Sequence, residues 1–307
     1  QSAAADTAPR YANRLLGELE LNLRRYARAY PYFKKEGLFP EAEKSRQLAV
    51  ATLLYGERFG ELSELLKDPA YRPYKTSSTQ LKLATHQLDW WKVAKILPIH
   101  RLSNIDWRMA TIAMIAALVW ATLLLRLGQI ESLSSRAAAF CFLAFIAGWF
   151  STIPTVFLAI VQDAYLGYEP DGELIPTMAY YIGGVGLREE FCKLLLFLPF
   201  AFALGRKDPE LESMIIASFV GLGFAAAENV SYFSNSFALA APARFLTANF
   251  FHISLTGMGG LFLCRAIQKS NYNDFLYIFG IIIIVHGAYD TLLSLPQFEE
   301  GYFLAMI

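Results

Sequence analysis

Residues 187–193, Leu-Arg-Glu-Glu-Phe-Cys-Lys, place charged side chains within an apolar segment that continues to Leu204, and the fold expected for the chain follows from this combination. An ionisable residue at membrane depth is costly, so by default it marks a candidate functional site. Three later apolar segments carry polar residues of their own, namely Glu228 with Asn229, His252, and His286 with Asp290. We expect these four groups to form one catalytic centre inside a membrane protein.

The chain divides into two parts of unlike composition. Residues 1–107 hold 17 Lys and Arg against 12 Asp and Glu, whereas residues 108–307 hold 10 against 15 and contain the long apolar runs. The first part is therefore water-soluble in character, and the second is long and apolar enough to cross a bilayer several times. We expect an all-α fold, with an N-terminal extramembrane helical domain over 1–107 and a polytopic membrane helix bundle over 108–307. The expected surroundings are the lipid bilayer, with no nucleic acid as a partner.

The first part has the pattern of helices joined by short turns, which is typical of an α-hairpin or solenoid-like domain. Leucine and tyrosine recur at spacings of three and four from Ala8 to Tyr30, and Pro31 is expected to interrupt that helix. No fixed-period repeat is evident. Residues 90–101 combine two tryptophans with lysines and apolar residues, which predicts an interfacial helix in the headgroup region. A scaffold role, with a regulator or substrate as the bound partner, is the expectation for this domain.

The second part contains about six candidate membrane spans, near residues 109–125, 137–161, 178–204, 214–233, 244–266 and 275–295. The connection over 162–177 is acidic and has no Lys or Arg, whereas the connections after the third and fifth spans carry Arg206 with Lys207 and Arg265 with Lys269. Cytoplasmic loops are enriched in Lys and Arg, so the acidic connection is expected on the outer side. This alternation predicts a multi-pass protein of the cell membrane whose N-terminal domain is extracytoplasmic.

The polar residues of the spans share one depth. Counted from charged residues at the cytoplasmic ends, Glu190, Glu228, His252 and His286 lie 13 to 17 residues into their helices. At the helical rise this is roughly 20 to 26 Å, toward the outer side of a hydrocarbon core about 30 Å thick. Side chains spread over a hundred residues of sequence are therefore expected to meet.

The residue types indicate hydrolysis. Adjacent Glu189 and Glu190 project about 100° apart on a helix, so we expect one to act as general base and the other to orient it or to meet Lys193. His286 and Asp290 are four residues apart and share one helix face, which suits two ligands, or a ligand and its orienting carboxylate. Two histidines with carboxylates suit zinc, and a water activated there would attack a peptide carbonyl.

Other interpretations of the same residues stay open. Glu189 with Lys193 has the spacing of a helix-surface ion pair, and His286 with Asp290 that of a structural hydrogen-bonded pair. For the whole protein, the alternatives are an ion- or proton-coupled membrane transporter and a catalytically inactive membrane scaffold. The glycines at 183, 184 and 186 favour close packing or an irregular helix start, and those at 257, 259 and 260 favour tight helix contacts.

Four ordered motifs resemble the PrsW family, which is related to the CAAX prenyl endopeptidases in a wider group of glutamate-dependent intramembrane proteases. The motifs are Glu-Glu-x-x-Lys at 189–193, Phe-x-x-x-Glu-Asn at 224–229, His252 followed by Gly257, and His-x-x-x-Asp at 286–290. The resemblance covers residues 137–295 and leaves the N-terminal domain outside.

The resemblance implies proteolysis of membrane proteins, with a single-pass, anti-sigma-factor-like protein as the substrate. It implies that Glu189 or Glu190 activates water, supported by Lys193 and Asn229. It also implies that a metal, zinc by its donor types, is bound, or the oxyanion stabilised, by Glu228, His252, His286 and Asp290. In one departure, Glu228 stands where the prenyl endopeptidases have a histidine, so their ligand arrangement does not carry over directly. Catalysis with a bound metal and catalysis by glutamate and histidine alone both remain open.

Overall fold

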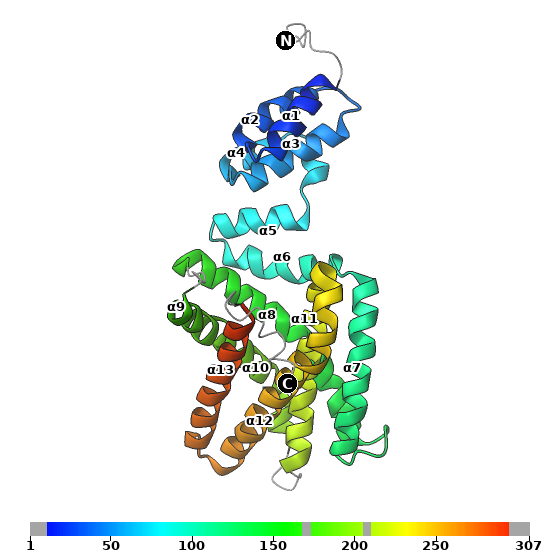
Figure 1. The fold of residues 1–307 in the computed structure, drawn as a ribbon, viewed down its shortest axis with the longest axis vertical. Coiled ribbons are helices and arrows are strands. Elements are labelled where there is room, and N and C mark those ends of the chain that lie inside the picture. The colour runs from blue at the N-terminus through cyan, green and yellow to red at the C-terminus, as the bar shows by residue number, and fades with distance from the viewer. Residues whose placement is uncertain (1–10, 168–172, 205–209, 295–307) are drawn as a thin grey trace. The chain divides into compact units, whose positions relative to one another are not determined.

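All secondary structure in the described residues is helical (Figure 1), so the expected all-α fold is confirmed. The computed structural model describes residues 11–167, 173–204 and 210–294, with backbone alone for 235–243. Contacts divide the chain into two compact units, Gln1–Leu102 and Ser103–Ile307. The expected membrane orientation depends on the charges of several connections between spans. Some of these charged residues lie outside the described ranges, namely Glu169, Asp171, Arg206 and Lys207.

Three helical hairpins make up the described part of the first unit. Their helices are α1 (Ala12–Asn22), α2 (Tyr26–Glu36), α3 (Glu43–Tyr55), α4 (Phe59–Leu65), α5 (Ser77–His86) and α6 (Trp90–Ser103). The single helix expected up to Tyr30 is wrong, because the chain turns at Arg24, whose φ of 56° is left-handed. Pro31 lies inside α2 and does not end it. The predicted interfacial stretch over 90–101 forms most of α6, where Trp91 is 72% exposed.

The turns within the three hairpins have the same backbone structure. Arg24, Glu57 and Leu88 have φ values of 56°, 54° and 54° and stand 33 and 31 positions apart. In each turn the next N–H donates to the carbonyl five residues earlier, at 2.8, 2.9 and 3.0 Å, which satisfies carbonyls at the helix end. The first unit is therefore a repeat structure of the short solenoid kind.

Equivalent positions in the second helix of each hairpin face the core. Ala29, Leu62 and Val93 each lie three to four residues into that helix, and all are 0% exposed. An alanine, a leucine and a valine at one structural position share apolarity but not identity. This is why the sequence shows no period while the backbone does.

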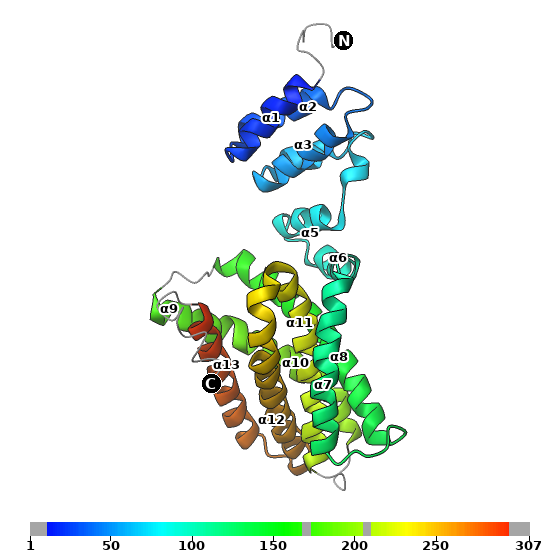
Figure 2. The same cartoon turned by 45° about the vertical axis from the view of Figure 1, so that its right-hand side comes forward.

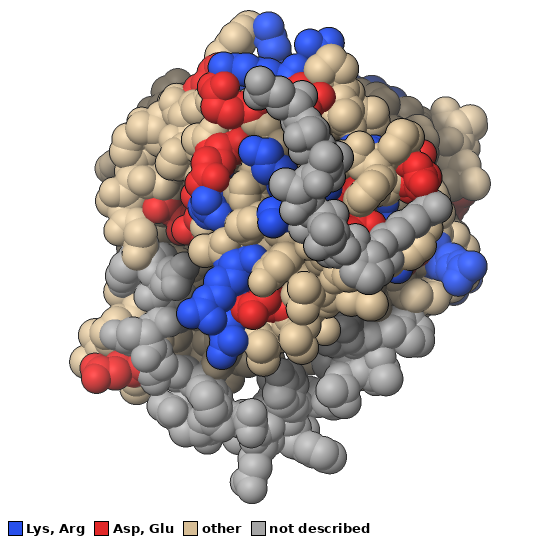
Figure 3. Space-filling model, turned by 90° about the horizontal axis from the view of Figure 1, so that it is seen from above, with Lys and Arg blue, Asp and Glu red and all other residues tan. Residues whose placement is uncertain are grey.

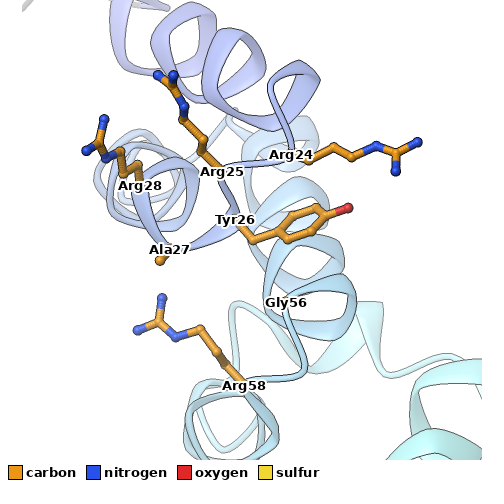
Figure 4. Close-up of a pocket in the computed structure, with 7 residues that line it drawn as sticks. All are labelled: Arg24, Arg25, Tyr26, Ala27, Arg28, Gly56 and Arg58. Atoms are coloured by element: carbon orange, nitrogen blue, oxygen red, sulfur yellow. The ribbon is translucent and has the colours of Figure 1, made fainter.

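A pocket of about 380 Å³ lies at the turns of the first two hairpins (Figure 4). Its lining residues are Arg24, Arg25, Tyr26, Ala27, Arg28, Gly56 and Arg58. Four of the lining residues are arginines and none is acidic, so part of the excess positive charge of the first unit lies at this pocket. Elsewhere, on the face drawn in Figure 3, basic and acidic side chains are interspersed, as on a surface that meets water.

The second unit is a bundle of long apolar helices (Figure 2). These are α7 (Trp107–Leu127), α8 (Arg136–Leu166), α9 (Leu174–Ala179), α10 (Leu187–Ala203), α11 (Glu210–Leu246), α12 (Ala248–Lys269) and α13 (Asn273–Ser294), with a π-helix at Tyr180–Gly186. In the described residues, five helical segments are long and apolar enough to cross a membrane: 107–127, 136–166, 210–234, 244–269 and 273–294. The sixth expected span, 178–204, is helical without a break up to Ala203, but its hydrogen bonding changes from α in α9 to π at Tyr180–Gly186 and back to α in α10, so it is not among these five segments.

The first part of α11 is the centre of the bundle. Of its most apolar window, 89% is buried, against 22% to 28% for α7, α8 and α13. A helix buried on all sides is surrounded by other helices, whereas the apolar surfaces of the outer helices suit contact with lipid. Functional groups carried by α11 therefore lie inside the protein.

Glycines let the neighbours of α11 approach its backbone. A Cβ atom at Gly223 would lie 2.0 Å from the Phe145 carbonyl oxygen of α8, and one at Gly221 would lie 2.2 Å from the His252 carbonyl oxygen of α12. The tight contact predicted for Gly260 is confirmed, because its Cβ would lie 2.2 Å from the Cβ of Ala217. Small residues at such crossings are typical of helix packing in membranes. These close contacts fix the position of His252 along the axis of α11.

Candidate active site

Polar side chains from four helices meet inside the second unit. They are Glu189, Glu190 and Lys193 of α10, Glu228 of α11, His252 of α12, and His286 with Asp290 of α13. The imidazole rings of His252 and His286 have centroids 5.4 Å apart. The convergence expected from the sequence is present, in a core whose other buried residues are mainly apolar or carry small polar side chains.

The π-helix brings α10 to this place. It spans Tyr180–Gly186, directly before the two glutamates, and contains three glycines, as the expected irregular helix start requires. A Cβ at Gly186 would lie 2.8 Å from the Ile283 carbonyl oxygen, so α10 begins in close contact with α13. π-Helical turns within α-helices are frequent at functional sites.

Glu190 is the most fully bonded carboxylate of the cluster and is 0% exposed. Its Oε1 accepts from Lys193 Nζ at 2.8 Å and lies 2.7 Å from His286 Nδ1. Its Oε2 accepts from the Thr256 hydroxyl at 3.3 Å. Because both oxygens are occupied, Glu190 is suited to orient its neighbours.

Lys193 is buried at 0% exposure, so its contacts with the two glutamates are not a helix-surface ion pair. Its Nζ also lies 2.8 Å from His252 Nδ1 and 4.0 Å from the centroid of the Phe224 ring. A charged lysine only donates hydrogen bonds, so His252 Nδ1 accepts. The proton of a neutral His252 then sits on Nε2, which faces Glu228 Oε2 at 3.1 Å.

Glu189 differs from its neighbour. Its Oε2 is buried and, within the described part of the chain, has no hydrogen-bond partner. The closest charged atoms are Lys193 Nζ and His286 Nε2, each at 3.5 Å. A buried carboxylate oxygen left open in this way is available to a water, a metal ion or a substrate.

The donor types and spacing fit a zinc ion. Ligand atoms of Glu189, His252 and His286 all lie within 4.8 Å of one another. Around His286 Nε2, Glu189 Oε2 is at 3.5 Å and Asp290 Oδ2 at 3.4 Å, close to the edge of about 3.3 Å that a tetrahedron with zinc bonds of about 2.0 to 2.1 Å requires. With Nδ1 directed at Glu190, His286 Nε2 is the nitrogen free to coordinate, in the usual carboxylate–histidine arrangement.

The geometry does not support the four predicted metal ligands equally. His252 and His286 belong to the compact three-residue group, which Glu189 completes. Glu228 and Asp290 each approach one imidazole, at 3.1 and 3.4 Å, but lie outside that group. Their role as metal ligands stays a prediction.

A family model named PrsW family intramembrane metalloprotease matches residues 136–307, more than half of the chain. The chain belongs to this family. No curated protein and no solved structure matches. The PrsW match runs from the start of α8 and includes all four helices of the polar cluster. The protein is therefore a multi-pass membrane protein with an intramembrane protease domain, and its first unit lies outside that domain.

Sequence reasoning missed two groups of the PrsW centre. Thr256 bonds Glu190, and its position four residues after His252, on the same helix face, is a signal that points to it. Arg244 bonds Glu228, which residue spacing does not indicate. Asn229, expected in a supporting role, donates to Asn249 at 2.9 Å and accepts from Arg244 at 2.6 Å.

Proposed function

We propose that this PrsW-family protein is an endopeptidase that cleaves membrane-anchored proteins with a water activated at Glu189. The single observation that carries the proposal is the open, buried Oε2 of Glu189, held between two histidines inside a membrane bundle. A purely structural cluster has no need to leave this oxygen without a partner, because an unpaired buried acceptor costs about 1 to 3 kcal/mol.

In the proposed reaction, Glu189 removes a proton from the attacking water as its oxygen adds to the peptide carbonyl carbon. The same carboxyl then returns this proton to the leaving nitrogen as the carbon–nitrogen bond breaks. Glu190 keeps Lys193 and His286 in place throughout, because it accepts from both. Lys193 supplies the positive charge nearest to the open carboxylate, at 3.5 Å.

We assign zinc as the cofactor: His286 and His252 would hold it, while Glu189, the third residue of that compact group, would act beside it as the base. When bound, zinc supplies a Lewis acid that polarises the water or the carbonyl. His286 would present Nε2 directly, and His252 would offer Nε2 while Glu228 Oε2, 3.1 Å away, stays beside it and orients the ring. Metal analysis of the purified protein tests the assignment, and His286→Ala is expected to lower the zinc content.

The proposed substrate is a single-pass membrane protein, anti-sigma-factor-like by family resemblance, cut near the outer face of the cell membrane. The hairpin array of residues 1–102 is proposed as an extracytoplasmic module that binds the substrate or a regulator. Its basic pocket and repeated hairpins support a binding role. Protease digestion of intact spheroplasts tests the side: an extracytoplasmic module is cut, and a cytoplasmic one is protected.

The decisive experiment uses purified full-length protein and a fluorescent single-pass reporter that the unmodified protein cleaves. Glu189→Gln removes the base but keeps the shape, and it is expected to lower turnover by at least a thousandfold. The control is Glu212→Gln, which changes a carboxylate outside the cluster and leaves turnover unchanged. Full cleavage by both Glu189→Gln and His286→Ala would refute the proposal.

A further inference from the structure

Arg244 reaches the active site because α11 does not continue straight. Along a straight helix, 15 residues span about 22 Å. Yet Arg244 Nε donates to Asn229 Oδ1 at 2.6 Å, and Arg244 Nη2 donates to Glu228 Oε2 at 2.5 Å. The last turn of α11 therefore lies beside a turn of the same helix about 15 positions earlier. Trp120 of α7 secures this return by donating to the Phe245 carbonyl at 2.8 Å.

Three contacts hold the guanidinium in place. Besides Glu228 and Asn229, it lies over the Tyr232 ring, with its central carbon 3.7 Å from the ring centroid. Asn229 in turn donates to Asn249 of α12 at 2.9 Å. The planar fork of arginine makes these directed contacts together, which the point charge of a lysine does not do.

One oxygen links this group to the histidine. Glu228 Oε2 accepts from Arg244 and also faces His252 Nε2 at 3.1 Å. The Glu228 side chain is 23% exposed, so without Arg244 it has room to rotate away from His252. Such a rotation would leave the His252 ring with Lys193 as its only charged partner among the described residues.

We propose that Arg244 is a positioning residue that locks Glu228 against His252 and so fixes the orientation of that imidazole in the catalytic centre. The expected effect of Arg244 on cleavage rests on the proposed function, whereas its effect on the orientation of the His252 imidazole does not. Arg244 acts through Glu228 and does not touch the reacting atoms. The return of α11 thereby completes the site, since it brings to Glu228 a second cation besides Lys193 among the described residues.

The first test is a double-mutant cycle on cleavage of the same reporter. Arg244→Ala is expected to lower kcat at least tenfold with KM within twofold, and Arg244→Lys is expected to recover part of the loss. In a Glu228→Gln background, Arg244→Ala is expected to change kcat less than twofold, because the partner through which it acts is already altered. Equal losses in both backgrounds, or a rise in KM alone, would overturn the proposal.

The matched control is Arg265→Ala. Arg265 also pairs with a glutamate of α11, Glu210, through two contacts at 2.8 and 2.6 Å, but this pair is exposed and lies outside the cluster. Its loss is expected to leave kcat unchanged. A fall equal to that of Arg244→Ala would show a general effect of removing charge, which would also overturn the proposal.

The second test needs no substrate. The chain has 4 histidines, so nitrogen NMR of selectively labelled protein in nanodiscs shows only four pairs of ring signals. Arg244→Ala is expected to shift the His252 ring signals, while those of His86 and His100 in the first unit serve as internal references. Unchanged His252 signals would reject the positioning role. If the unmodified protein cleaves no reporter but the shift occurs, the proposed function fails and the positioning role stands.

Discussion

Two lysine–glutamate pairs of similar length lie in the two units. In the first unit, Lys67 Nζ is 2.5 Å from Glu64 Oε1, and in the second, Lys193 Nζ is 2.8 Å from Glu190 Oε1. The first pair is 68% and 71% exposed, whereas both members of the second are fully buried. Water screens the first pair, and its geometry costs side-chain entropy, so pairs of this kind contribute about 0 to 1 kcal/mol. Contact length therefore says little about what a pair does.

The energetics of the buried Lys193–Glu190 pair are different. Its charges have lost their hydration, so each depends on its partner and on the surrounding hydrogen bonds. An apolar pair in the same place would often fold as well or better, which means that fold stability alone does not explain the charges. In the first unit, by contrast, apolar residues such as Phe33 and Leu53 form the core, and the one described charged residue that is buried, Glu36, accepts from the Tyr11 backbone N–H at 2.9 Å instead of joining a cluster of charges. A buried cluster of several charges that fold stability does not require points to a chemical role.

The largest effect is expected for Glu190→Ala. The change leaves the Lys193 ammonium without its closest counter-charge, and loss of one partner of a buried pair costs about 3 to 5 kcal/mol. We expect a large fall in the thermal unfolding midpoint in detergent and no measurable cleavage. The double change Glu190→Ala/Lys193→Met removes both charges, so it should regain most of the stability while staying inactive. An unchanged unfolding midpoint for Glu190→Ala would mean that the buried pair contributes as little to stability as the exposed Lys67–Glu64 pair.

Packing gives a second contrast, this time within the membrane unit. An alanine at Gly221 would place its Cβ 2.2 Å from the His252 carbonyl oxygen, whereas Gly280 has open space around the equivalent position. Gly221→Ala must separate α11 from α12, which costs about 1 to 3 kcal/mol as overpacking and displaces His252. We expect a lower unfolding midpoint and reduced turnover, both measured on purified protein.

Gly280→Ala is the matched control for Gly221→Ala. With no clash, it is expected to keep full turnover and to gain about 0.5 to 1 kcal/mol from the higher helix propensity of alanine. If the two variants behave alike, the close approach at Gly221 does not set the position of His252.

Much of the active site is predictable from the sequence because polar residues in apolar spans are few and expensive. Glu190, Glu228, His252 and His286 stand out for this reason, and their shared depth indicates that they meet. Arg244 was not predictable in the same way. It stands at the edge of an apolar run, where arginine is ordinary, and only the fold-back of α11 brings it to Glu228.

Two features of the fold could not be predicted from the sequence, because they depend on backbone conformation and not on residue type. The hairpin repeat is carried by backbone conformation at Arg24, Glu57 and Leu88, three unlike residues, so no residue pattern reveals it. The π-helix within the span over 178–204 was not predicted either, because the short apolar and glycine-rich stretch around it carries no pattern that distinguishes π from α hydrogen bonding. The glycines at 183, 184 and 186 indicate an irregular start but not its type.

The smallest expected effect belongs to the exposed pair. Lys67→Ala removes a contact at 2.5 Å between side chains that are mostly in water, so the free energy of unfolding should change by less than about 0.5 kcal/mol. Reporter turnover at the same temperature is expected to match that of the unmodified protein. Raising the salt concentration should erase even the residual difference, because salt screens exposed charges far more than buried ones. A loss near that of Glu190→Ala would end the distinction between the two pairs.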